Sequence, residues 1–155
     1  MKQGNFLTPK EEIGIETAIG EVEKFSAAEI KVVVAQRSAS EGVAEEEARE
    51  AVMDRADQEF IIEGLGHTRE STGILIFISL YEQAVEVRGG KAIDEKITQA
   101  GWNQYVSIIL EGIKAGKPGQ GIASAIRESG KMLVREFPVQ PGDINEISNH
   151  VIYKD

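Results

Sequence analysis

Carboxylates are the residues of this sequence most able to do chemistry. Glu29 stands just before an apolar run, Asp54 and Asp57 lie within one Ala- and Glu-rich segment, and Asp94 follows a glycine pair. Oxygen ligands suit hard divalent cations, and Ca²⁺ takes about 6–8 of them in irregular geometry. We therefore predict a divalent-cation site formed by Glu29, Asp54, Asp57 and Asp94, with calcium more favoured than magnesium.

Each of these acids also has an ordinary structural interpretation. Asp94 near a helix start would stabilise the helix dipole. Asp54 and Asp57 would be solvated positions on a helix face. Glu29 would form an ion pair, with Arg88 as the candidate partner. The sequence has no EF-hand spacing, so any cation site would be assembled from distant segments.

The glycine pair Gly89-Gly90 is the candidate anion-binding element. Successive backbone N–H groups before a helical turn can form a nest for an anion. The alternative is a glycine turn that simply ends a strand. No P-loop pattern is present, and the absence of cysteine excludes a thiol nucleophile and a thiolate metal site.

The elements that must position these residues can be read from hydrophobic spacing and turn signals. Thr8, Pro9 and Glu11 predict a capped helix start, and the apolar spacing that follows predicts a helix over residues 9–25. Short β-branched or apolar runs predict strands at 29–36, 73–80 and 84–88. An amphipathic helix is expected over 43–63, with Ala44, Ala48, Val52, Ala56 and Phe60 on its inner face.

The second half of the chain is predicted to be mainly helical. We expect a short helical turn at 92–97, a helix from about Thr98 to Ile113, and a last helix ending near Glu136. Pro138 and Pro141 then end regular structure. We predict one domain over residues 7–137, with a polar, extended tail over 138–155 that packs on it or trails from it.

The order of these elements predicts an α/β fold. The near-continuous apolar strand at 73–80 indicates burial on both faces, so helices should cover both sides of the sheet. A strand–helix–strand unit makes the first two strands parallel, and the short connection at 81–83 makes the third antiparallel in a hairpin. We therefore expect a three-layer α/β/α sandwich with a small mixed sheet of about four strands. Glu29, the loop 67–72 and the segment 89–95 should meet at one edge.

Composition limits the partners. The chain has 155 residues, a length typical of one domain, and a net charge of −9. An acidic protein without a basic stripe is a poor match for the phosphate backbone, so we do not expect nucleic acid as a partner. No apolar run has the length of a signal peptide core or of a membrane span, so we expect no membrane insertion and a cytoplasmic location.

Several of these features, in this order, resemble the TPM domain family, in its short, stand-alone branch. The resemblance extends over about residues 7–147 and depends on the conjunction of several segments: Ala28-Glu29-Ile30-Lys31-Val32, Phe60, Gly64-Leu65-Gly66-His67-Thr68, Gly73-Ile74-Leu75-Ile76-Phe77-Ile78, the glycine pair, Ile93-Asp94-Glu95-Lys96-Ile97, Trp102, Gly121-Ile122, Gly130, Leu133, Phe137-Pro138 and Asp143-Ile144-Asn145-Glu146.

The resemblance implies an α/β/α sandwich, a divalent-cation site, usually for calcium, and a disputed acid-phosphatase activity in some members. The family pattern usually places an Asp after the first glycine that follows the third strand, whereas this chain has Gly90. We expect a regulatory or interaction domain that binds a divalent cation at its acidic edge. The alternative is a weak metal-dependent acid phosphatase. A protein partner would bind through the acidic surface or the C-terminal tail.

Overall fold

Two buried parallel strands form the centre of the sheet in the computed structural model, which describes residues 3–68, 70–142 and 147–155. They are β1 (Glu29–Ala35) and β2 (Gly73–Ser79), and every residue of both is buried. Their β-branched and apolar side chains are typical of strands covered on both faces. The predicted strand–helix–strand unit and its parallel pairing are confirmed.

The two outer strands complete a mixed sheet of order β3-β2-β1-β4. Strand β3 (Ala84–Gly89) pairs antiparallel with β2, which confirms the hairpin. Strand β4 (Ile152–Lys154) pairs parallel with the end of β1, from Val33 to Ala35. The sequence predicted no strand in the tail because three residues in a polar segment leave no alternating pattern. The residues 143–146 of the tail, part of the resemblance, lie outside the described residues.

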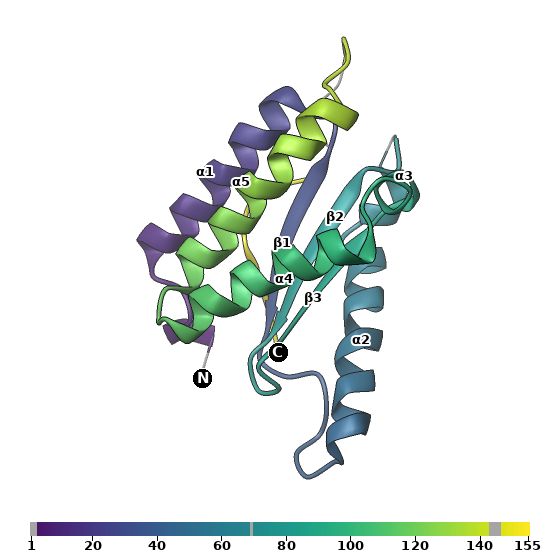
Figure 1. Ribbon diagram of the computed structural model, residues 1–155. Helices are drawn as coiled ribbons and strands as arrows, with labels where there is room; N and C mark the ends of the chain where they lie inside the picture. Colours follow the sequence, from purple (N-terminus) through teal and green to yellow (C-terminus); the bar gives the residue numbers. More distant parts are fainter. Residues whose placement is uncertain (1–2, 69, 143–146) are drawn as a thin grey trace.

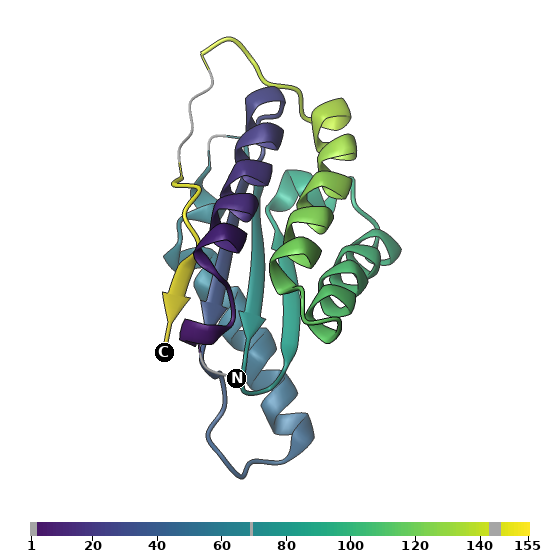
Figure 2. The ribbon, with the colours of Figure 1, turned by 90° about the vertical axis from the view of Figure 1, so that its left-hand side faces the viewer.

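Helices cover both faces of the sheet and confirm the three-layer architecture. Figures 1 and 2 place α1 (Pro9–Phe25), α4 (Gln99–Lys114) and α5 (Pro118–Glu136) on one face, with α2 (Glu45–Ile62) on the other. Three helical segments are shorter: η1 (Gln3–Asn5) precedes α1, η2 (Leu65–His67) follows α2, and α3 (Lys91–Asp94) follows the third strand.

The helix ends follow the local signals of the sequence. At the start of α1, the Glu11 N–H donates to the Thr8 hydroxyl and the Thr8 N–H donates to the Glu11 carboxylate, which is the predicted capping box. After α2, Gly64 adopts a φ of 77°, a left-handed conformation that favours glycine. Thr98 caps α4 by accepting from the Gly101 N–H.

Strand alternation divides the core into two layers. Ile30, Val32 and Val34 of β1 pack towards α1, α4 and α5, whereas Val33 and Ala35 belong to the smaller cluster under α2. The smaller cluster takes Val52 and Ala56 from α2, as predicted. Ala44, also predicted for the inner face, is exposed and precedes α2. Figure 1 shows why, since the start of α2 extends beyond the end of the sheet.

A glycine contact sets the distance between α4 and α5. A Cβ added to Gly112 would lie 2.6 Å from the Gly121 Cα. We expect Gly112→Ala to lower the free energy of unfolding by about 1–2 kcal/mol, because overpacking outweighs the gain in helix propensity. Urea denaturation measures the loss. In Gly14→Ala, on α1 with open space around its Cβ, the same exchange should instead stabilise by about 0.5–1 kcal/mol. Equal effects of the two exchanges would contradict the close contact.

Candidate functional site

The starts of β1 and β2 and the end of β3 meet at one edge of the sheet, as the sequence predicted. Glu29 pairs with Gly73 across the parallel strands, and the Gly90 N–H donates to the Gly73 carbonyl at 2.8 Å. The Ala92 N–H donates to the carbonyl of Ser71 at 3.2 Å, which ties the loop before β2 to α3. Backbone hydrogen bonds therefore fix this edge.

Arg88, on β3, is the charged centre of this edge. Its Nε lies 2.8 Å from Asp57 Oδ1 on α2, and its Nη2 lies 3.0 Å from Glu86 Oε1. A third bond runs from Nη1 to the Val87 carbonyl at 3.1 Å. The predicted pair between Arg88 and Glu29 therefore gains no support from these contacts, in which Asp57 and Glu86 are the partners of the arginine.

The electrostatics of Arg88 agree with this geometry. Burial alone would lower the pKa of the guanidinium, but its hydrogen bonds to Asp57 and Glu86 and the negative charges of these carboxylates outweigh burial and raise the pKa. The side chain of Arg88 is 26% exposed, and that of Asp57 is 63% exposed. The Asp57 carboxylate is thus accessible to solvent but already has a cationic partner.

Asp94 is held by an aromatic residue. Burial raises the pKa of Asp94, while a hydrogen bond from Trp102 and the charge of Arg88 oppose that rise. Trp102 in turn packs edge-on against Tyr105, with ring centroids 6.4 Å apart. Asp94 therefore serves to connect α3 to α4.

Glu29 belongs to a different carboxylate pair. It is only 4% exposed and lies beside Glu23 of α1, whose Oε2 accepts from the Ile30 N–H at 2.8 Å. Burial is the main cause that raises the pKa of Glu23 to about 8, and the neighbouring Glu29 raises it further. The hydrogen bond from the Ile30 N–H and the charge of Lys31 oppose this rise. Glu29 lies on β1 and Arg88 on β3, and β2 separates these strands in the sheet. The Glu23–Glu29 pair and the Asp57–Arg88 contact therefore involve strands that are not neighbours.

The four predicted cation ligands are not brought together. Asp54 is exposed on α2, Asp57 pairs with Arg88, Asp94 accepts from Trp102, and Glu29 lies beside Glu23. In the part of the chain that the structure describes, no three Asp, Glu or His side chains form a group that could hold a metal ion. The described residues therefore give the predicted divalent-cation site no geometric support, and the site stays a prediction.

The glycine pair is tightly packed against the loop before β2. A Cβ added to Gly90 would lie 2.4 Å from the Ser71 carbonyl oxygen, so the aspartate of the family pattern has no room in this conformation. The amides of Gly90 and Ala92 already donate to carbonyls at this edge. The predicted anion nest therefore gains no support from the geometry, and the alternative of a glycine turn agrees with it.

Two features of this edge escaped sequence reasoning. The Glu23–Glu29 pair joins residues from α1 and β1 whose side-chain directions depend on the helix–sheet packing. Lys31 is 2% exposed and donates to the Ser148 carbonyl at 2.9 Å, a contact with the tail. The one available signal was an alternation of Glu29 and Lys31 with apolar residues at the start of a buried strand.

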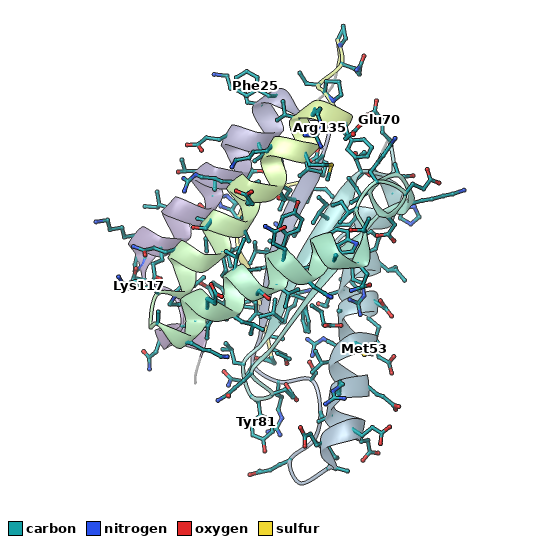
Figure 3. All side chains as sticks on the ribbon, viewed as in Figure 1. Phe25, Met53, Glu70, Tyr81, Lys117 and Arg135 are labelled. Atoms are coloured by element: carbon teal, nitrogen blue, oxygen red, sulfur yellow. The ribbon has the colours of Figure 1, made fainter. Side chains whose placement is uncertain are left out.

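The outer face of α2 is a second candidate surface. Three large apolar side chains on this helix are exposed: Met53 by 44%, Ile61 by 66% and Ile62 by 62%. Figure 3 labels Met53 half-way along the helix. The helix contains seven acidic and two basic residues, which accounts for more than half of the net charge of −9. We call Ile61, Ile62 and the exposed acids Glu50 and Asp54 the α2 surface.

Comparisons with known proteins place these observations in context. A family model described as the TPM domain matches residues 1–132. The NMR structure of the BA42 protein from the psychrophilic bacterium Bizionia argentinensis is similar, with a TM-score of 0.80 and 28% sequence identity, over 96% of this chain and 95% of that chain. No curated protein matches. Within the described residues, no helix has the length and apolar character needed to cross a membrane.

Proposed function

Since this chain belongs to the TPM domain family, we propose that it is a protein-interaction domain and that the α2 surface is its binding face. The observation that carries the proposal is the exposure of Ile61 and Ile62, both above 60%, on the helix that holds most of the net negative charge. Large aliphatic side chains surrounded by charge are typical of recognition surfaces.

Charge defines the partner. The exposed acids of α2 include Glu45, Glu46, Glu47, Glu50 and Asp54, which favour a segment rich in lysine or arginine and repel acidic ones. The exposed isoleucines require apolar side chains on that segment. The partner is therefore a basic amphipathic segment of another protein, whose apolar side chains cover Ile61 and Ile62 at the end of α2 while its cations face the acids.

The position of α2 supports this assignment. Its inner residues Val52, Ala56 and Glu59 are buried against the sheet, so the fold fixes the helix and leaves the opposite face in solvent. A rigid helix loses little conformational entropy on binding, so less of the free energy gained from its contacts is offset by ordering.

A titration tests this function. The probe is a fluorescent 18-residue peptide of leucine and lysine with an apolar helical stripe, followed by anisotropy at about 0.1 M salt. We expect the double variant Ile61→Ser/Ile62→Ser to weaken binding by about tenfold or more, since truncation of central apolar anchors costs 1–2 kcal/mol or more. A matched control is Ile13→Ser, on the exposed face of α1 and 64% exposed in the wild-type protein.

The control variant should bind as the wild type does. A peptide of the same composition, in an order that forms no apolar stripe, should bind more weakly and respond more steeply to salt. Equal affinity of the wild type and the Ile61→Ser/Ile62→Ser variant would refute the proposed surface. The phosphatase alternative depends on a metal held by Glu29, Asp57 and Asp94, and because these residues do not converge, we do not propose it.

A further inference from the structure

Arg88 is a cationic side chain that interacts with two of the four carboxylates predicted to bind a metal ion. Its guanidinium bridges Asp57 on α2 and Glu86 on β3, at 2.8 and 3.0 Å, and its charge acts on Asp94. The guanidinium of Arg88 therefore interacts with two of the acids predicted for the cation site, with Asp57 through an ion pair and with Asp94 through its charge.

The backbone beneath this arginine closes the space for a further ligand. Gly90 stands where the family pattern usually has an aspartate, and a Cβ at that position would lie 2.4 Å from the Ser71 carbonyl oxygen. The same carbonyl accepts from the Ala92 N–H, and the Gly90 N–H donates to Gly73. The end of the loop before β2 lies in contact with the glycine pair, and the hydrogen bonds to the Ser71 and Gly73 carbonyls hold it there.

The geometry points to Arg88 in place of a metal ion at this edge. The guanidinium supplies the positive charge, and the chain needs no divalent cation there. Three separate observations agree. The acids nearest the edge have protein partners, the position of the missing acid is filled by backbone contact, and within the described residues no three acidic or histidine side chains are grouped to hold a metal.

Arg88 and a cation would compete for the same carboxylates, which makes the inference testable. Removal of the guanidinium in Arg88→Met leaves Asp57 and Glu86 without their partner while the fold around them is retained. The experiment measures thermal unfolding and amide NMR shifts of the wild-type protein and of Arg88→Met with and without 10 mM CaCl₂, and again with MgCl₂. Arg127→Met is the matched control, since Arg127 forms an exposed pair with Glu21 at 3.3 Å, away from the edge.

On addition of either cation, we expect the thermal unfolding midpoint of the wild-type protein to change by less than about 1 °C, with no saturable amide shifts at residues 57, 73 or 88–94. The Arg127→Met control should give the same result. The midpoint of Arg88→Met should rise by about 3–5 °C with calcium, as expected for millimolar affinity in a protein of this size.

Saturable shifts at the edge of the wild type would overturn the inference. A lack of calcium response in both proteins would also overturn it, because Arg88 and a cation would then not share these carboxylates. If Arg88→Met is unfolded, Arg88→Gln gives the same comparison with a side chain that still accepts and donates hydrogen bonds.

Discussion

Gly90→Asp, which restores the aspartate of the family pattern, should destabilise the protein by about 3 kcal/mol rather than create a cation site. The reason is steric, because the new Cβ would lie 2.4 Å from the Ser71 carbonyl oxygen and 2.9 Å from its carbon. Neither atom can move away without breaking the hydrogen bond from Ala92 to the Ser71 carbonyl. Urea denaturation of Gly90→Asp and of the wild type measures the difference.

Gly4→Asp is the control for the charge and size of the new side chain, since no atom lies within 4 Å of a Cβ built at Gly4. It should change the free energy of unfolding by less than about 0.5 kcal/mol. A Gly90→Asp variant as stable as Gly4→Asp would mean that the loop before β2 yields to a side chain. The close packing described for this edge would then be incorrect.

The buried Glu23–Glu29 pair predicts a fall in stability as the pH rises. The pKa of Glu23 is raised from 4.5 to about 8 in the folded protein, chiefly by burial, so the folded state binds the Glu23 proton more tightly than the unfolded state does. The stabilisation is complete below pH 4.5 and is lost as the pH rises through about 8. From this shift we expect a loss on the order of 3 kcal/mol between pH 5 and pH 9.

The variant Glu23→Gln isolates this effect. The amide resembles the protonated carboxyl, and its oxygen can still accept from the Ile30 N–H, so the variant should be more stable than the wild type at pH 9 and nearly equal at pH 5. Glu21→Gln, on the exposed side of the same helix with its side chain 57% exposed, should keep the wild-type profile. Parallel pH profiles of the wild type and Glu23→Gln would contradict the buried pair.

Much of the fold was predictable because its signals are local. The capping box of Thr8 and Glu11, the apolar run of β2 and the glycine after α2 each specify an element without reference to the rest of the chain. Strand β4 was not predictable, since its pairing with β1 depends on a tail that returns over α1, where the Tyr153 hydroxyl donates to Glu12 at 2.5 Å and the Val151 N–H donates to Glu16 at 3.4 Å.

The candidate site was predictable only in part. Chain topology correctly brought Glu29, the loop before β2 and the glycine pair to one edge, because strand order and direction determine which strand ends meet. The partners of the acids were not predictable, since they depend on side-chain directions. Arg88 reaches α2 instead of β1, and Glu29 meets Glu23, a residue that no pattern in the sequence connects with it.

The exposure of Ile61 and Ile62 was likewise beyond sequence reasoning. A helix with seven acidic residues was expected to present a solvated polar face, and two consecutive isoleucines at its end are compatible with either face. Their position became clear only when Val52 and Ala56 were seen to set the inward direction of α2. The combination of apolar exposure and negative charge on α2 is the basis of the interaction function proposed for this TPM domain.

One measurement tests that function most directly: amide chemical-shift mapping of the uniformly ¹⁵N-labelled protein during titration with the unlabelled leucine–lysine peptide. We predict saturable shifts concentrated on residues 50–62 of α2, with little change on α1 and α5. Shifts spread over all acidic surfaces of the protein, or centred on the α1–α5 face, would contradict the assignment of α2 as the binding face.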